Sequence, residues 1–326
     1  MTDNALPRRS RRLLVAGALV ASLALAACGS DDDGGEATTT ASADASGTRT
    51  VQTAMGPVTI TGTPKRVVVL DTPELDTTTT LGVTPVGTVK AAVGDGFPRY
   101  LADKAKGIEV VGEIEAPNLV AIAKLKPDLI LSSKVRDEKR YAQLSKIAPT
   151  VFTETPADWK ANVITQAEAL GKAGEARRLL TDYEQRAKAV GKALGDPADT
   201  TVSVVRWLPG EIRLYSPNSF VGSILKDVGV ALPPAAEKAS DINATLSLEN
   251  LDEADADVVY QTVYGPAKDT DQARGTALPA WKDIDAVEDG RVYDEPDDVW
   301  MLGIGITGAQ QVLNELEKTL PAAESR

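Results

Sequence analysis

The chain has 326 residues and a formal net charge of −12 at pH 7, with 35 Lys and Arg against 47 Asp and Glu. Nucleic acids and anionic lipid surfaces attract clustered basic residues, so this composition argues against both as direct partners. The chain contains no histidine, which excludes Ser-His-Asp catalysis, His-based zinc or copper sites and a His-ligated haem. Its length exceeds what one hydrophobic core usually serves, so we expect two lobes.

The first 27 residues have the pattern of a secretory signal peptide. Basic residues lie between Arg8 and Arg12, and a short apolar run from Leu13 to Ala27 follows. The only cysteine, Cys28, follows the apolar run and lies within the string Leu25-Ala26-Ala27-Cys28-Gly29, which looks like a bacterial lipobox. We therefore expect lipidation of Cys28, and two acyl chains would anchor the protein on the extracytoplasmic face of the cell membrane. The arginine pairs leave both general secretory and twin-arginine export open.

Residues 28–50 are mostly Gly, Ser, Thr, Ala and Asp, with almost no large apolar side chain. Such a segment cannot form a core, so it is predicted to be a disordered tether. The remaining chain is divided into an N-terminal α/β lobe at 51–172, a connecting helix at 173–195 and a C-terminal α/β lobe at 196–326.

Within each lobe, short apolar runs alternate with helical patterns. Unbroken apolar runs are typical of strands buried on both faces of a parallel sheet. The predicted strands are Val67–Leu70, Val110–Val111, Leu129–Leu131, Val202–Trp207 and Val258–Thr262. Helices are predicted at Phe220–Val228 and Gln310–Leu320. The expected fold is α/β, with two Rossmann-like lobes built on mainly parallel central sheets.

Two features indicate how the lobes are related. The segment Asn118–Leu131 aligns without a gap with Ser247–Tyr260, matching Asp128 to Asp257, which suggests an internal duplication or simply two similar α/β units. Between the halves, one long apolar stripe runs from Ala176 to Leu194 and predicts a single connecting helix that acts as a rigid strut.

The lipobox, tether, two lobes and connecting helix together resemble the substrate-binding lipoproteins of ABC importers for iron-siderophore complexes and vitamin B12, the class III substrate-binding proteins. The strings that carry the resemblance are Pro117-Asn118-Leu119, Leu125-Lys126-Pro127-Asp128-Leu129-Ile130, Ile147-Ala148-Pro149-Thr150-Val151, Val204-Val205-Arg206-Trp207-Leu208-Pro209-Gly210-Glu211-Ile212-Arg213-Leu214-Tyr215 and Trp300-Met301-Leu302-Gly303-Ile304-Gly305. The rigid connecting helix implies modest hinge motion between the lobes.

Ligands of open α/β sheets bind beyond the carboxyl ends of strands and between domains. Arg206 ends an apolar strand, so its guanidinium must meet a carboxylate or face the cleft. The resemblance implies that an arginine here hydrogen-bonds the oxygens that coordinate iron. Arg136 either shares this role or belongs to a solvated helix start. Scarce aromatic residues gather in the C-lobe, and we expect Trp207, Tyr215, Tyr264 and Trp300 among the ligand contacts.

Docking on a permease is a second role that the resemblance implies. Similar receptors carry one glutamate on each lobe that pairs with an arginine of the membrane partner, and Glu249 fits the C-lobe position. The matching N-lobe position is Val120. Either Glu115 or Glu113 substitutes for the missing glutamate, or docking is atypical.

We therefore expect a monomeric, non-enzymatic receptor that binds a ferric siderophore and delivers it to an ABC permease. No cofactor is expected, and iron enters only as the siderophore-bound ligand. The acidic run Asp294-Glu295-Pro296-Asp297-Asp298 favours a neutral or cationic hydroxamate complex over an anionic catecholate. Cobalamin, haem and a cell-envelope scaffold role stay open as alternatives. The string Gly303-Ile304-Gly305-Ile306-Thr307-Gly308 formally matches a dinucleotide fingerprint, but close helix packing explains it better because no second βαβ unit can follow.

Overall fold

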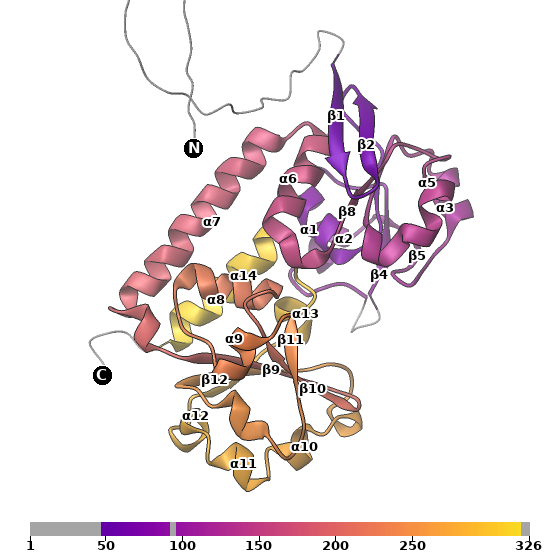
Figure 1. The fold of residues 1–326 in the computed structure, drawn as a ribbon. Coiled ribbons are helices and arrows are strands. Elements are labelled where there is room, and N and C mark those ends of the chain that lie inside the picture. Colours follow the sequence, from indigo (N-terminus) through magenta and orange to yellow (C-terminus); the bar gives the residue numbers. More distant parts are fainter. Residues whose placement is uncertain (1–46, 92–95, 321–326) are drawn as a thin grey trace, which may run out of the picture. The chain divides into compact units, whose positions relative to one another are not determined.

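Two central β-sheets organise residues 47–91 and 96–320, the part of the chain that the computed structural model describes (Figure 1). One sheet has six strands in the order β6-β5-β4-β3-β7-β8, and the other has five in the order β11-β10-β9-β12-β13. We call the parts built on them the N-lobe and the C-lobe. The expected α/β fold with two lobes is confirmed.

The N-lobe sheet is parallel except for its edge strand β6. Its central strand β3 and its neighbour β7 are wholly buried, as their apolar runs predicted. Val110 in β5 is 39% exposed, because this strand lies next to the edge and only one of its faces is fully covered. The N-lobe elements are β1 Thr48–Thr53, β2 Gly56–Thr61, β3 Val67–Val69, α1 Thr72–Thr80, β4 Gly87–Lys90, α2 Ala102–Ala105, β5 Glu109–Glu113, β6 Ala116–Pro117, α3 Leu119–Lys124, β7 Leu129–Ser133, α4 Lys134–Asp137, α5 Tyr141–Leu144, β8 Thr150–Thr153 and α6 Trp159–Leu170.

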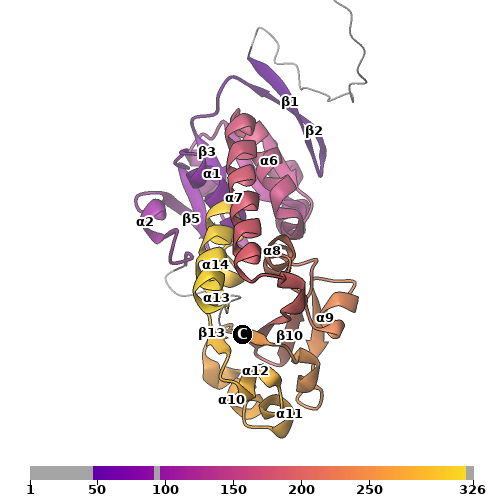
Figure 2. The same cartoon turned by 90° about the vertical axis from the view of Figure 1, so that its left-hand side faces the viewer.

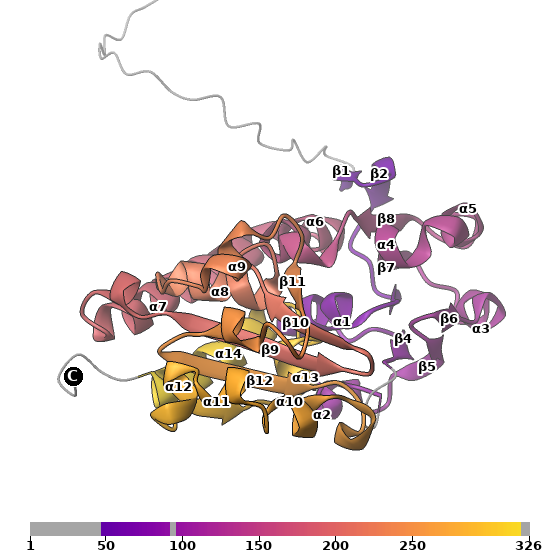
Figure 3. The ribbon, with the colours of Figure 1, turned by 60° about the horizontal axis from the view of Figure 1, so that its bottom comes forward.

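The C-lobe sheet is mixed. Strands β9, β12 and β13 are parallel, whereas β10 pairs antiparallel with both β9 and β11. Helices α10, α11 and α12 lie on the side of this lobe away from α7 (Figures 1 and 3). The C-lobe elements are β9 Val202–Leu208, β10 Glu211–Tyr215, α8 Phe220–Val228, α9 Pro234–Lys238, β11 Asn243–Leu246, β12 Val258–Val263, α10 Gln272–Gly275, α11 Pro279–Lys282, α12 Asp285–Glu288, β13 Val292–Asp294, α13 Asp297–Trp300 and α14 Ile306–Thr319.

The connecting helix α7 spans Ala173–Ala193, and the predicted stripe is its buried face. The last helix, α14, runs beside α7 (Figure 2) and also packs against α1 of the N-lobe. The helix that the sequence placed in the C-lobe therefore contributes to the contact between lobes.

Equivalent aspartates begin equivalent strands in the two lobes. Asp128 accepts the backbone N–H groups of Lys65 and Arg66 at 2.8 Å each, just before β3. Asp257 accepts the N–H of Thr201 at 2.8 Å, just before β9. Each aspartate starts a strand that pairs parallel with the strand it caps. This correspondence agrees with the alignment of the two segments and supports an internal repeat.

The N-terminal predictions fall mostly outside the described residues. The signal peptide and Cys28 lie outside them, as does most of the expected tether. The described part begins just before β1 at Thr48, so the expected tether is at least three residues too long at its C-terminal end. Over residues 47–91 and 96–320, no helix combines the length and apolar character needed to cross a membrane.

Candidate binding cleft

The β9–β10 hairpin positions two arginines side by side. Its turn at Pro209 and Gly210 brings Arg206 and Arg213 into direct register across the antiparallel pair. Side chains alternate between the two faces of a strand, so paired residues share a face and the next residue along points the opposite way. Tyr215 lies two residues after Arg213 and belongs to the same face. The hairpin therefore presents two guanidinium groups and a phenol together.

Arg206 is held by a bidentate ion pair. Its Nε and Nη2 groups donate to the two carboxylate oxygens of Asp297 at 2.7 Å each, and both side chains are only 9% exposed. Its Nη1 donates to the hydroxyl of Tyr215 at 3.3 Å. The ring of Tyr264 lies 4.9 Å from the guanidinium carbon and covers one face of the group. This arrangement fixes a cation in a largely water-excluded position.

Arg136 forms the opposite wall, on the short helix α4 that follows β7. Its Nε donates to Asp71 at 2.7 Å and its Nη1 donates to Glu115 at 2.9 Å. Asp71 is only 4% exposed and also caps α1 by accepting the N–H of Thr72. The guanidinium is thus oriented by two carboxylates from different parts of the N-lobe.

Both walls line one cavity of about 300 Å³ between the lobes. Three arginines, Arg136, Arg206 and Arg213, are the charged members of its lining. Each is paired with a carboxylate, which is Glu211 in the case of Arg213. The other lining residues are mainly apolar or hydroxyl-bearing: Val135, Thr155, Ala157, Tyr215, Ser219, Phe220, Val221, Ile242, Trp300, Met301, Leu302 and Ile304.

Residues 67–299 match the family model of the periplasmic binding proteins. The chain belongs to the periplasmic binding protein family. It is 39% identical to the "Probable siderophore-binding lipoprotein YfiY" of Bacillus subtilis, over 92% of this chain and 94% of that protein. It is 30% identical to the Fe(3+)-citrate-binding protein YfmC of the same organism, over 91% and 94% of the two chains. The crystal structure of Staphylococcus aureus SirA complexed with staphyloferrin B superposes with a TM-score of 0.77 at 34% identity, covering 83% of this chain and 98% of SirA.

Within this periplasmic binding protein, the six predicted ligand contacts lie in different environments. Arg206, Arg136, Tyr215 and Trp300 line the cavity, although Trp300 is itself 0% exposed. Tyr264 lies behind Arg206 as a stacking partner. Trp207 was expected to contact the ligand, but it points away from the cleft. It is fully buried, its Nε1 donates to Gln261 at 2.8 Å, and its ring packs against Trp281. Because Trp207 follows Arg206 on the same strand, it must point to the opposite face.

The sequence prediction missed Arg213, although a signal for it was available. In a hairpin that turns at Pro209 and Gly210, the residue opposite Arg206 is Arg213, so locating the turn identifies the partner. Phe220 and Met301 were also missed. They come from separate elements, and only the tertiary arrangement brings them to one cavity.

The acidic run before Trp300 is not a free negative surface in this periplasmic binding protein. Asp297 is paired with Arg206, and Asp298 pairs with Arg99 of the N-lobe at 2.8 Å. Both aspartates are neutralised by arginines, so the reason for expecting this run to attract a neutral or cationic ligand no longer holds. Asp76 and Tyr100 of the N-lobe contact each other at 2.7 Å, at the N-terminal end of α14.

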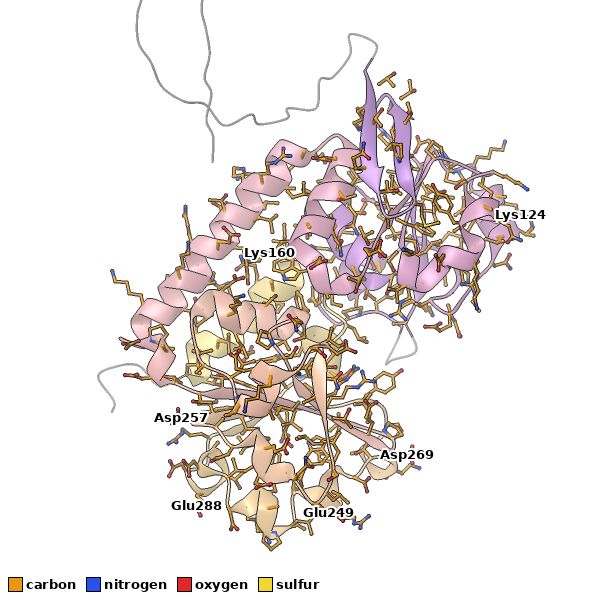
Figure 4. All side chains as sticks on the ribbon, in the orientation of Figure 1. Lys124, Lys160, Glu249, Asp257, Asp269 and Glu288 are labelled. Atoms are coloured by element: carbon orange, nitrogen blue, oxygen red, sulfur yellow. The ribbon has the colours of Figure 1, made fainter. Side chains whose placement is uncertain are left out.

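The two glutamates predicted to dock on a permease are both exposed. Glu249 lies on the C-lobe, toward the end farthest from the N-lobe (Figure 4). The Glu115 side chain is 81% exposed, and it is also the partner of Arg136. Val120, in the first turn of α3, is 65% exposed. Among the residues that the structure describes, no group of three or more Cys, Asp or Glu side chains could hold a metal ion.

Proposed function

We propose that this periplasmic binding protein binds a ferric siderophore in the cleft between its lobes and delivers it to an ABC permease, with lipidated Cys28 as its membrane anchor. The names of the relatives support the siderophore class, because YfiY is called siderophore-binding and SirA was crystallised with staphyloferrin B. Iron enters as part of the ligand.

Arg206 carries the proposal. A guanidinium held bidentate on one edge by Asp297 still has N–H groups on its other edge, and these suit the oxygen atoms that surround chelated iron. Arg136 and Arg213 offer further N–H groups from the two sides of the cavity. Tyr215 and Trp300 supply the amphipathic and apolar contacts that the organic part of a siderophore requires.

A hydroxamate is the favoured siderophore type. The three arginines are each balanced by at least one carboxylate, so the cavity offers hydrogen-bond donors with little net positive charge. Such a lining suits a ferric hydroxamate of low net charge better than a highly anionic catecholate, whose charge would have to be desolvated without compensation.

Tryptophan fluorescence tests this proposal because Trp300 lines the cavity. A ferric hydroxamate should quench the tryptophan fluorescence of the purified protein saturably. Ferric catecholate and ferric citrate complexes should bind with lower affinity. Tight binding of citrate or catecholate with no response to hydroxamate would contradict the favoured type. No response to any ferric chelate, with saturable binding of cobalamin or haem, would contradict the siderophore proposal.

A further inference from the structure

The cleft continues past Arg136 into a second hollow on the N-lobe. This outer hollow, of about 500 Å³, is lined by α4, its continuation to Arg140, and Glu115 and Glu154. Val135 and Arg136 line both hollows, so the inner cavity and the outer one meet at these two residues. The inner cavity alone, at about 300 Å³, is at the small end of the range for ligand pockets.

Val135 is the apolar boundary between the two hollows. Val135 is 66% exposed, and the other exposed large hydrophobic residues among those the structure describes are Val120 at 65% and Val110 at 39%. A single exposed valine needs no explanation by itself. Val135 differs from the other two because it lies between two concave surfaces, where one bound molecule would cover it.

Two ion pairs flank Val135 in the outer hollow. Lys134 pairs with Glu154 at 2.7 Å, and Arg136 pairs with Glu115 at 2.9 Å. Lys139, in the 3-10 turn Glu138–Arg140 that follows α4, lines the same hollow. The outer hollow thus combines an apolar contact with exposed charged groups that can exchange their partners for those of a ligand.

From this arrangement we infer an outer subsite at Val135 that takes an arm of the chelate: an aliphatic linker lies on Val135, and the polar group beyond it reaches the ion pairs of Lys134 and Arg136. The inference rests on the proposed function and goes beyond it, because it assigns a specificity determinant outside the cavity that holds the metal. The protein then favours chelates with an extended flexible chain over compact ones of the same chemical type.

Val120 supplies a matched control. Both valines are the second residue of a short helix, α4 for Val135 and α3 for Val120, and their exposed fractions are 66% and 65%. Only Val135 lines the two hollows. Val135→Asn and Val120→Asn remove the same apolar surface without adding charge, so their effects on folding should be alike.

Two ferric hydroxamates test the subsite: ferrioxamine B, which has a long linear chain, and ferric acetohydroxamate, which has none. The wild-type protein should bind ferrioxamine B more tightly. Val135→Asn should weaken ferrioxamine B binding about tenfold, as expected for losing one buried valine contact, while Val120→Asn leaves it unchanged. Ferric acetohydroxamate affinity should be the same in all three proteins.

Equal affinity of the wild type for the two chelates, or equal effects of the two substitutions, would overturn the outer subsite. Failure of the wild type to bind either chelate would instead count against the hydroxamate proposal. The two ideas can therefore fail separately.

Discussion

The carboxylate of Asp76 in the N-lobe accepts the backbone N–H of Gly308, in the first turn of α14, at 3.0 Å. The same carboxylate accepts the N–H of Thr307 at 3.2 Å and the hydroxyl of Tyr100 at 2.7 Å. A helix N-terminus has unpaired N–H groups, so a buried carboxylate there satisfies donors that water cannot reach. Because an N-lobe side chain caps α14, a helix of the C-lobe, this contact ties the two lobes together.

Asp76→Ala should destabilise the protein by about 2 kcal/mol or more, since it leaves several buried donors without an acceptor. Thermal unfolding should show a clearly lower midpoint, and hydrogen exchange should rise in the first turn of α14. Asp103→Ala is the control, because the Asp103 side chain is 90% exposed and pairs only with exposed Lys106. An Asp76→Ala protein as stable as this control would contradict a role in joining the lobes.

The glycines near α14 show what the sequence could predict. Close packing was expected for Gly303, Gly305 and Gly308, and a β-carbon at Gly308 would lie 1.5 Å from the carbonyl oxygen of Gly303. The expectation of close packing is confirmed. Its partner was not predicted, because nothing in the local pattern says that Asp76 and Tyr100, more than 200 residues earlier, approach these glycines.

In the cleft, too, the local sequence pattern predicted the elements but not their distant partners. Apolar runs predicted β3, β7, β9 and β12, since burial on both faces leaves a signal in consecutive residues. Arg206 could be singled out because a charged group at the end of such a run needs a partner. The identity of the partner, Asp297, depends on how α13 packs against the C-lobe sheet, where it contacts β12. The opposite orientations of Arg206 and Trp207 follow from strand alternation and could have been predicted.

The buried carboxyl group of Glu74 should make the folding stability of the protein depend on pH. It is 1% exposed, and Gln166 Nε2 donates to its Oε1 at 3.0 Å. Within the described residues, Glu74 Oε2 and Gln166 Oε1 have no hydrogen-bond partner, and a proton on Glu74 would let these two oxygens bond to each other. Burial raises the pKa of Glu74 to about 8, and nearby Asp71 and Asp137 add to the shift while Arg136 opposes it.

The folded state therefore holds one more proton than the unfolded state between about pH 4.5 and pH 8. The stability that Glu74 contributes is fully present below this window and is lost as the pH rises through it. Glu74→Gln keeps a reciprocal pair of hydrogen bonds with Gln166 but cannot ionise. Its free energy of unfolding, from urea titrations, should fall less than that of the wild type between pH 6 and pH 9. If the free energy of unfolding of Glu74→Gln falls with pH as steeply as that of the wild type and of the exposed-site variant Glu109→Gln, the raised pKa does not belong to Glu74.

Arg206 and Asp297 separate stability from ligand binding. Removing either partner leaves a buried charge unpaired, which costs about 3–5 kcal/mol, so Arg206→Ala and Asp297→Ala should both lower the unfolding midpoint. The double substitution should recover part of this loss, because no unpaired charge remains. It should not recover ferric siderophore binding, measured by fluorescence quenching, since the donor of Arg206 is still missing. A double variant that binds normally would show that Arg206 is only structural.

The two glutamates that we expect to dock on a permease, Glu249 and Glu115, differ in their surroundings, and uptake measurements can separate their roles. Glu249 is exposed on the C-lobe and forms no ion pair within the described residues. Glu249→Arg should repel a permease arginine and lower the uptake of radiolabelled iron roughly tenfold. Its affinity for the chelate should stay normal. Glu115 also orients Arg136, so Glu115→Arg should weaken chelate binding as well as uptake.

Glu288→Arg, at another exposed site of the C-lobe (Figure 4), makes the same charge change and should alter neither measurement. Normal uptake by Glu249→Arg would remove Glu249 from the docking surface. If Glu115→Arg loses uptake but binds the chelate normally, Glu115 acts on the permease alone. It then takes the place of the N-lobe docking glutamate, whose expected position is occupied by Val120. Because Val120 is exposed, Val120→Glu should in that case raise uptake in the Glu115→Arg background, as a carboxylate at the N-lobe docking position would again meet the permease arginine.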